Sequence, residues 1–322
     1  MNPVLDLIEA FRRSKTMFTA VRLGVFDRLP ADLSTLVRET GSDAGALERL
    51  LDGCVGLGLA AKREGRYENT EVARIYLRRS SPRTLAGYIL YSDQVLYPMW
   101  ARLEDAVRDG SHRWGQGEIF DHFFRSDESM RTFLAGMHGL GMLSSPLVVA
   151  AFDLRRFRRL VDLGGATGHL AAAARERYPA MQVAVFDLPQ VIAAAPAGEG
   201  VEWIAGDFFQ DPLPPADLYA LGRILHDWSE EKIRVLLRKI HAALPPGGAL
   251  LIAEKLLDPD KSGPVEAHMQ SLNMLVCTEG KERTLEEYRE LLVEAGFARV
   301  EGRRTGAPLD AVMAELTGPG AG

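Results

Sequence analysis

A glycine-rich segment in the second half of the chain has the composition of a cofactor-binding loop. Residues 161–168 read Val-Asp-Leu-Gly-Gly-Ala-Thr-Gly, and they follow an apolar run and precede a predicted helix. Glycines in such a loop let the backbone approach a ligand closely. Gly165 and Gly168 occupy two of the three glycine places of the dinucleotide motif, but Leu163 stands at the first place. The segment therefore favours a cofactor without a pyrophosphate.

Two acidic residues are spaced to complete an adenosine site. Asp187 follows Gly168 by 19 residues at the end of the next predicted strand, where its carboxylate could accept hydrogen bonds from both ribose hydroxyls. Asp207 and Phe208 end the following strand and could bind the adenine amino group and stack on its ring. Since no Gly-Lys-Ser/Thr loop is present to bind phosphates, the pattern fits S-adenosylmethionine. The alternative is a turn whose glycines serve only helix–strand packing.

A histidine at the end of the fourth predicted strand could act as a general base. It lies in the sequence Arg-Ile-Leu-His-Asp-Trp, residues 223–228. An unperturbed imidazole has a pKa of about 6.5, so it can accept a proton from a reacting group near neutral pH. The alternative for His226 is a core histidine with satisfied hydrogen bonds, and the other six histidines are expected to be structural.

These residues require a parallel sheet to bring them together. From about Arg158 the chain alternates strands, turns and helices in the manner of a doubly wound α/β fold. Because the carboxyl ends of parallel strands meet at one edge, the strand-end residues should converge there. The predicted strands are 160–163, 183–186, 201–205, 218–221, 249–253, 297–301 and 310–315, and the predicted helices are 229–243 and 286–295.

The first part of the chain predicts a mainly helical domain with a small hairpin. Val4, Leu7, Ile8 and Phe11 have helical spacing and form an apolar face that could pack on a partner chain. Residues 60–70 predict two short strands around a glycine turn, which suggests a winged-helix unit. Over residues 1–95, 14 basic against 12 acidic residues leave a charge of only +2, a poor footprint for DNA. Dimerisation or closure over a substrate is the favoured role.

Composition excludes several classes of protein. The 322 residues include 38 Lys and Arg against 44 Asp and Glu, and the net charge of −6 argues against nucleic acid as a partner. Two cysteines, Cys54 and Cys277, give no disulfide framework or zinc motif, which favours a reducing, cytoplasmic setting. Early charged residues break up a signal-peptide core, and no later segment is expected to reach membrane-spanning length. No metal is predicted.

Seven short motifs, in order along nearly the whole chain, carry a specific resemblance. The motifs are Ser14-Lys15-Thr16-Met17-Phe18, Phe186-Asp187-Leu188-Pro189, Gly206-Asp207-Phe208-Phe209, Asp211-Pro212-Leu213-Pro214, His226-Asp227-Trp228, Ser271-Leu272-Asn273-Met274-Leu275 and Thr278-Glu279-Gly280-Lys281-Glu282-Arg283. By these motifs the chain resembles the plant-type, S-adenosylmethionine-dependent small-molecule O-methyltransferases.

The resemblance implies an architecture and a reaction. It implies a Rossmann-type class I methyltransferase domain, α/β in class, with an N-terminal winged-helix dimerisation domain. The expected domains are 1–95 for dimerisation, 96–157 for connecting helices that line the acceptor pocket, and 158–322 for cofactor binding. A homodimer is expected to methylate the hydroxyl of a small aromatic acceptor. N-methylation, other chemistry on the same cofactor, and a non-catalytic cofactor-sensing regulator are the alternatives.

The resemblance also implies site residues. His226 matches the general base, and Glu254 and Glu282 match two flanking acids, whose alternatives are a solvated strand end and a surface helix start. Cys277 stands where members that methylate acetylserotonin have Gln, which removes an amide and leaves the acceptor open. The implied cofactor contacts are Gly164, Gly165, Gly168, Asp187, Asp207, Phe208, Arg223 and Ser144. The implied acceptor contacts are Asp227, Asn273, Cys277, Met137 and Met274, with pocket and core even for the two methionines and core favoured for Phe133 and Met142.

Overall fold

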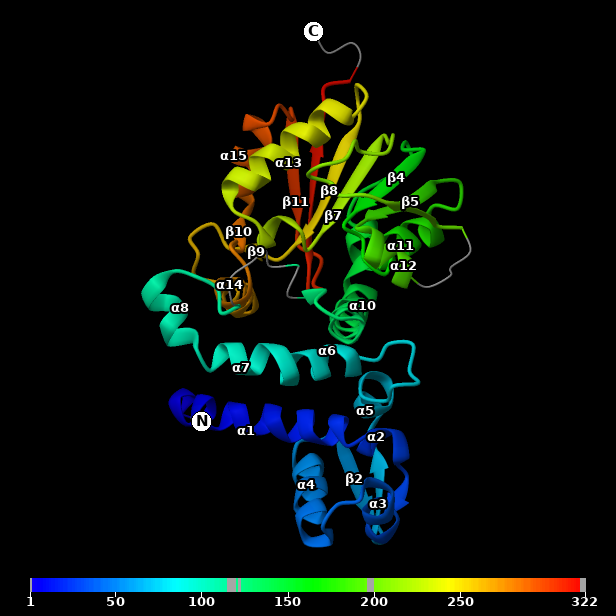
Figure 1. Ribbon diagram of the computed structural model, residues 1–322, viewed down its shortest axis with the longest axis vertical. Coiled ribbons are helices and arrows are strands. Elements are labelled where there is room, and N and C mark those ends of the chain that lie inside the picture. The colour runs from blue at the N-terminus through cyan, green and yellow to red at the C-terminus, as the bar shows by residue number, and fades with distance from the viewer. Residues whose placement is uncertain (1, 115–119, 121–122, 196–199, 319–322) are drawn as a thin grey trace. The chain divides into compact units, whose positions relative to one another are not determined.

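The computed structural model describes residues 2–114, 120, 123–195 and 200–318, and the chain divides into two compact units, Met1–Pro98 and Met99–Gly322. Figure 1 labels their elements. In the first unit the helices are α1 (Pro3–Arg22), α2 (Val25–Arg28), α3 (Leu33–Thr40), α4 (Ala44–Gly56), α5 (Glu71–Tyr76), α6 (Ala86–Tyr91) and a π-helix (Ser92–Leu96), and the strands are β1 (Ala31–Asp32), β2 (Ala60–Arg63) and β3 (Arg66–Asn69). A short helix, α7 (Tyr97–Trp100), spans the boundary between the units.

The first unit confirms the predicted hairpin. β2 and β3 pair antiparallel, and β1 adds a third strand to give the order β1-β3-β2. The side chain of Thr70 accepts a hydrogen bond from the backbone N–H of Ala73, which makes Thr70 the N-cap of α5. Phe26, Leu36 and Leu51 are buried in the core of this unit, whereas the apolar face of α1 is exposed.

The second unit is built on a seven-stranded sheet with the order β11-β12-β8-β7-β4-β5-β6. Its strands are β4 (Arg159–Leu163), β5 (Gln182–Asp187), β6 (Glu202–Ala205), β7 (Leu218–Gly222), β8 (Ala249–Glu254), β11 (Arg299–Arg303) and β12 (Asp310–Glu315), with a separate pair β9 (Leu256–Leu257) and β10 (Arg283–Thr284). The strands from β4 to β8 are parallel, while β12 and β11 run antiparallel to them. This arrangement confirms the predicted doubly wound α/β class.

Helices cover both faces of this sheet (Figure 1). Those of the unit are α8 (Leu103–Asp109), α10 (Asp127–Ala150), α11 (His169–Arg177), α12 (Pro189–Ala194), a 3-10 turn (Leu225–Asp227), α13 (Glu230–Ala243), α14 (Val265–Cys277) and α15 (Leu285–Glu294). On one face Ile233 of α13 and Leu291 of α15 share a core with Tyr219. On the other face Val148 of α10 and Leu170 of α11 share a core with Leu218. Successive residues of the same strand therefore enter opposite cores.

The strand predicted over 297–301 is misplaced by two residues. β11 begins at Arg299, because the backbone N–H of Phe297 donates to the carbonyl of Leu292 in the turn that ends α15. Phe297 is buried, so its apolar character resembled that of a strand residue. The helix α14 and the small pair β9–β10 were not predicted, since neither has a distinctive periodic pattern in the sequence.

One helix contradicts the expectation that no segment reaches membrane-spanning length. By length and composition, α10 is long and apolar enough to cross a membrane. Of its most apolar 18-residue stretch, 44% is buried inside the structure, and Val148 and Val149 belong to the core beneath the sheet. The helix lies within the segment 96–157, which is predicted to hold connecting helices, but its interspersed Gly and Ser residues masked its apolar length. Its burial accounts for its apolar composition.

Packing between α10 and α11 depends on a glycine. A Cβ added at Gly141 would lie 2.2 Å from Cδ2 of His169, whose Nδ1 forms a 2.8 Å hydrogen bond with Oγ of Ser145. The ring of His169 is thus held against the backbone of α10 by the absence of a side chain at position 141.

Substitution Gly141→Ala is expected to lower the free energy of unfolding by about 1–3 kcal/mol, because overpacking outweighs the better helix propensity of alanine. Chemical denaturation measures this. The matched control is Gly45→Ala on the exposed side of α4, where no clash arises and a gain of up to about 1 kcal/mol is expected. Equal or greater stability of the Gly141 variant would contradict the packing described.

Candidate active site

The predicted cofactor residues meet at the carboxyl edge of the parallel strands. Asp187 ends β5, and its Oδ2 accepts a 2.8 Å hydrogen bond from the backbone N–H of Ala166, while Oδ1 accepts one of 2.7 Å from Leu188. Burial raises the pKa of Asp187 to about 6, against the effect of these two N–H groups, which lower it. The carboxyl group of Asp187 therefore fixes the loop that follows β4.

That loop is shaped by close contacts that only glycine tolerates. Gly164 and Gly168 have φ values of 69° and 73°. A Cβ at Gly164 would lie 2.6 Å from Cδ1 of Ile224 and 3.2 Å from Cε1 of Phe208, so Phe208 lies beside the loop. A Cβ at Gly165 would lie 2.6 Å from the carboxyl group of Asp162. The backbone of the loop is therefore closely packed against these three side chains.

The chemistry of these residues fits S-adenosylmethionine. Acidic side chains follow β5 and β6, and the loop over 164–168 contains no basic residue that a phosphate would require. Asp207 has one oxygen engaged, since Oδ1 accepts from the backbone N–H of Phe209 at 2.7 Å. Asp162, beneath the loop, is buried with Oδ2 unpartnered in the described part of the chain, and burial followed by the charge of Asp187 raises its pKa to about 8. These acids suit hydroxyl and amino donors.

Ser144 and Arg223 remain predictions as cofactor contacts. Ser144 is fully buried, and its Oγ donates to the carbonyl of Leu140 within α10. Arg223 follows β7 with a φ of 58°, a strained value for a non-glycine residue, and its Nε is buried without a hydrogen-bond partner among the described residues. The strain and the unpaired donor of Arg223 mark it as a residue held for a purpose at this edge.

The structure brings His226, Glu254 and Glu282 together. Nδ1 of His226 lies 2.7 Å from Oε1 of Glu282 and 3.2 Å from Oε2 of Glu254. Both carboxyl groups are buried, which excludes a solvated strand end and a surface acid as their settings. Oε1 of Glu254 also accepts from the backbone N–H groups of Ile224 and Leu225 at 3.0 and 2.9 Å. Glu254 thus holds both the turn that carries His226 and the imidazole itself.

The opposite nitrogen of the imidazole is the one available for chemistry. In the described part of the chain Nε2 of His226 has no hydrogen bond, and its nearest charged atom is Oδ1 of Asp227 at 3.7 Å. When Nδ1 donates to the ionised form of Glu282 or Glu254, a neutral ring presents Nε2 as an acceptor. The geometry is that of an oriented base.

Burial raises the pKa values of the acids around this ring. The pKa of Glu282 rises to about 8, that of Glu254 to about 7 and that of Asp227 to about 7, in each case chiefly through burial. Arg223 is the strongest opposing charge on Glu282, because its guanidinium favours the ionised form. Oε2 of Glu254 and Oε2 of Glu282 have no hydrogen-bond partner among described residues, which agrees with carboxyl groups that hold protons readily. The three residues also offer ligand atoms within 4.8 Å of one another, as a metal site would, although metal binding was not predicted.

The predicted acceptor residues lie on α14, on α10 and, in the case of Asp227, on the 3-10 turn. Cys277 is buried, and its Sγ lies 3.8 Å from Oδ1 of Asn273. Met274 is buried as a core residue, while Met137 and Phe133 on α10 are half-buried. Met142 was expected in the core, but it is 39% exposed because its position on α10 faces outward. The roles of these residues toward an acceptor stay predictions.

The contacts of the aromatic residues near this site were not predicted from the sequence. Trp228 contacts Phe120 and Phe209, with ring centroids 5.3 and 5.1 Å away. Nε1 of Trp100 donates to Oδ1 of Asn273 at 2.8 Å, and Nε1 of Trp114 donates to the carbonyl of Cys277 at 2.9 Å. No local signal in the sequence links these tryptophans to α14, because their partners are more than 160 positions away.

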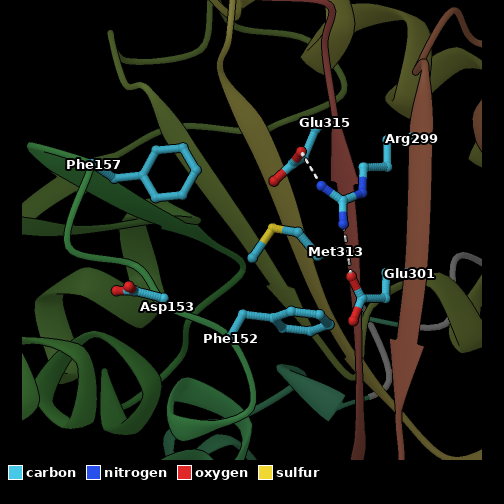
Figure 2. A pocket seen from close by; sticks show the side chains of 7 residues that line it. All are labelled: Phe152, Asp153, Phe157, Arg299, Glu301, Met313 and Glu315. Atoms are coloured by element: carbon cyan, nitrogen blue, oxygen red, sulfur yellow. Dashed lines mark hydrogen bonds and ion pairs between the residues drawn. The ribbon is translucent and has the colours of Figure 1, made fainter.

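A cavity of about 220 Å³ lies elsewhere in the second unit, and Figure 2 shows the side chains that line it. Arg299 forms ion pairs with Glu301 and Glu315, at 3.3 and 3.8 Å. Glu315 pairs with Ala249 at the amino end of β8, opposite the end that carries Glu254. The residues that line the cavity include none of the predicted site residues, so the cavity is separate from the candidate active site.

Comparison with known proteins decides the family. A family model described as an O-methyltransferase domain matches residues 100–298, and a model described as an O-methyltransferase dimerisation domain matches residues 5–79. The chain belongs to the O-methyltransferase family. This confirms the resemblance read from the sequence motifs. The enzyme is an O-methyltransferase that depends on S-adenosylmethionine.

Individual relatives of this O-methyltransferase cover nearly all of it. It is 44% identical over 331 residues to acetylserotonin O-methyltransferase of Gallus gallus, a match that covers 96% of each chain. A probable bifunctional dTTP/UTP pyrophosphatase/methyltransferase protein of Homo sapiens is 41% identical over 98% of this chain, which spans 54% of that protein. The crystal structure of human N-acetylserotonin methyltransferase in complex with S-adenosylmethionine has a TM-score of 0.94 at 38% identity, covering 98% of this chain and 96% of that one.

The raised pKa of Glu282 predicts a pH-dependent stability. Its ordinary pKa of 4.5 rises to about 8 in the folded protein, so between these values the folded state binds more protons than the unfolded state. The free energy of unfolding should therefore fall as the pH rises through this window. Substitution Glu282→Gln should remove this loss, because the amide is neutral throughout. The variant should gain on the wild type by at most about 1.4 kcal/mol per pH unit, as measured by denaturation at several pH values.

The control for this experiment is Glu286→Gln on α15, whose side chain is 62% exposed. Since the carboxyl group of Glu286 stays in water, its replacement should give no comparable slope. A flat difference between wild type and the Glu282 variant would contradict a buried, proton-holding carboxyl group at position 282.

Proposed function

We propose that this enzyme transfers the methyl group of S-adenosylmethionine to the hydroxyl group of a small aromatic acceptor, with His226 as the general base. The observation that carries the proposal is the contact of Nδ1 of His226 with Glu282 at 2.7 Å, which leaves Nε2 as the proton acceptor. The imidazole is oriented by two buried acids, as a catalytic base requires.

Different residues bind the cofactor and accept the proton in the single displacement step that transfers the methyl group. S-adenosylmethionine supplies a methyl group on a positively charged sulfur. Asp187, Asp207 and the glycine loop would hold the adenosine part by their carboxylate and backbone groups. As the acceptor oxygen attacks, Nε2 of His226 takes the hydroxyl proton, and Glu254 and Glu282 stabilise the imidazolium through Nδ1. Most of the acceleration comes from alignment of the oxygen with the methyl group, and the base adds about 10²–10⁴-fold.

The names of the relatives suggest hydroxyindoles as the first acceptors to test. The chicken and human relatives are named for acetylserotonin. Cys277 replaces the Gln that the resemblance expects, so its pocket offers a thiol in place of an amide. We therefore propose a hydroxyindole or a related phenol as acceptor and leave amines as an outcome of the same assay.

We also propose that the enzyme is a homodimer through its first unit. The dimerisation-domain match covers residues 5–79, and the face of α1 exposes 61% of Val4, 73% of Leu7 and 53% of Ile8. Contiguous apolar side chains on one helix face favour a protein partner. A reducing compartment such as the cytoplasm suits the two free, buried cysteines, Cys54 and Cys277.

Substitution His226→Asn tests the proposed base. Formation of S-adenosylhomocysteine should fall by about 10²–10⁴-fold, because the general base is lost. Affinity for S-adenosylmethionine, measured by calorimetry, should stay nearly unchanged. The acceptor panel contains N-acetylserotonin, other hydroxyindoles, catechols, flavonoids, hydroxyquinones and matching amines.

The matched control is His241→Gln. This substitution replaces a histidine near the end of α13 that packs against Phe297. Its turnover should equal that of the wild type. Loss of cofactor binding in the His226 variant would refute the role of base. Absence of turnover by the wild-type enzyme on the whole panel, despite cofactor binding, would refute the proposed acceptor class.

The double substitution Leu7→Glu and Ile8→Glu should separate the proposed dimer into monomers, because two charges cannot be buried in an apolar interface. Light scattering after size-exclusion chromatography measures the mass. Val235→Glu changes an exposed valine of α13, outside the dimerisation domain, and should leave the dimer intact. A wild-type mass of one chain at micromolar concentration would overturn this proposal.

A further inference from the structure

The indole of Trp100 determines which way the amide of Asn273 faces. Nε1 of Trp100 lies 2.8 Å from Oδ1 of Asn273. An indole N–H can donate but never accept, so the amide oxygen must face the indole and the NH₂ group must face away. A flipped amide would set donor against donor and lose the hydrogen bond.

We propose that Trp100 is a positioning residue that restricts Asn273 to donating hydrogen bonds, so that the enzyme selects acceptors with a carbonyl or similar oxygen at this position over acceptors with an amine. This inference rests on the proposed function, since it names the class of acceptor for the same site.

The amide oxygen is held from a second side. Sγ of Cys277 lies 3.8 Å from Oδ1 of Asn273 and 3.6 Å from Sδ of Met99. Burial raises the pKa of the Cys277 thiol to about 12, so the thiol keeps its proton and stays a weak donor toward that oxygen. A Cys at this position therefore adds to the effect of Trp100, because both neighbours of Oδ1 are donors.

The end of α14 that carries this amide is fixed in place. Nε1 of Trp114 donates to the carbonyl of Cys277 at 2.9 Å, and the backbone N–H of Arg113 donates to the carbonyl of Val276 at 2.8 Å. These bonds engage the backbone and leave the amide of Asn273 unaffected. These bonds hold the backbone of the helix end in place. Among the described residues, Trp100 is the one whose indole N–H donates to the amide of Asn273.

The same helix end adjoins the proposed base. Oγ of Ser271 accepts from the backbone N–H of Glu282 at 3.4 Å, and Glu282 holds the imidazole of His226. The charge of Asp227 acts on Cys277, and Oδ1 of Asp227 lies 3.7 Å from Nε2 of His226. Asn273 is therefore a neighbour of the reacting region. Its side chain is half-buried.

An Asn273 amide that can only donate distinguishes acceptor molecules by whether they offer it a hydrogen-bond acceptor. An acceptor with a carbonyl at this position gains a hydrogen bond from Nδ2 of Asn273. An acceptor with an amine there would meet a second donor, and both groups would lose partners when water is excluded. The sign of this preference follows from the direction of the amide, which Trp100 sets.

The test substitution is Asn273→Asp, which keeps an oxygen for Trp100 but replaces the free donor with an acceptor. The probes are two acceptors that differ by C=O against CH₂, namely N-acetylserotonin and its N-ethyl amine analogue, or the same change on whichever phenol the panel identifies. The wild type should favour the carbonyl compound by about tenfold or more in kcat/KM. In the variant this ratio should fall by at least about tenfold, mainly through KM, with the KM for S-adenosylmethionine unchanged.

Trp100→Phe tests the positioning residue itself. It removes the indole N–H and keeps an aromatic ring, so the amide can turn and the ratio should fall by about 2–10-fold. The matched control is Trp114→Phe, which removes an indole donor from the backbone of the same helix. That control should change both acceptors alike and leave the ratio as in the wild type.

A measurement without turnover checks the geometry. The protein contains four tryptophans, so the indole N–H region of a ¹⁵N–¹H spectrum is simple, and loss of one signal in Trp100→Phe assigns it. Asn273→Leu should move that signal upfield and speed its exchange with water, whereas Asn273→Asp should not.

The outcomes separate this inference from the proposed function. If the wild-type enzyme methylates the panel but Asn273→Asp leaves the acceptor ratio unchanged, the inference is wrong and the function stands. If Asn273→Leu leaves the Trp100 signal unmoved, the inference is also wrong. If the panel yields no product, the proposed function fails, while the indole signal still decides whether Trp100 orients the amide.

Discussion

The site depends on the burial of acidic side chains around one imidazole. Removing Glu254 and Glu282 from water costs free energy, and only good hydrogen bonds offset this cost. Glu254 meets the condition through the backbone N–H groups of Ile224 and Leu225, and Glu282 meets it through Nδ1 of His226. The end of β7, the end of β8 and the segment before β10 are thereby forced together. The arrangement that stabilises the acids also orients the base.

The cofactor edge obeys a similar constraint. The carboxyl group of Asp187 is satisfied by N–H groups of Ala166 and Leu188, which ties the glycine loop to the neighbouring strand. The register of β4 beside β5 pairs Leu163 with Phe186 and so sets both strand ends at one height. α10 closes against this edge, where Gly141 makes room for His169. Cofactor residues and the proposed base are therefore positioned by a single rigid sheet edge.

The proposed acceptor specificity depends on fewer contacts than the proposed base does. The base and its acids are buried and bonded on several sides, whereas the proposed acceptor selection rests on the direction of one amide. Trp100 sets that direction through one hydrogen bond, and Cys277 supports it. A change at either position would alter which acceptors bind without disturbing the base. Such a division lets one fold serve different acceptors.

The sequence by itself determined the fold class, the family and the strand-end residues, because periodicity and spacing are properties of neighbouring residues. β4, β5, β7 and β8 appear where apolar runs predicted them, and His226 follows β7 as expected. Other features depended on packing. Phe297 resembled a strand residue because a buried position favours an apolar residue whether or not it lies in a strand. Whether Glu254 and Glu282 are solvated or buried was decided only where distant segments meet. Trp100 and Asn273 lie 173 positions apart, and only the folded chain makes them partners.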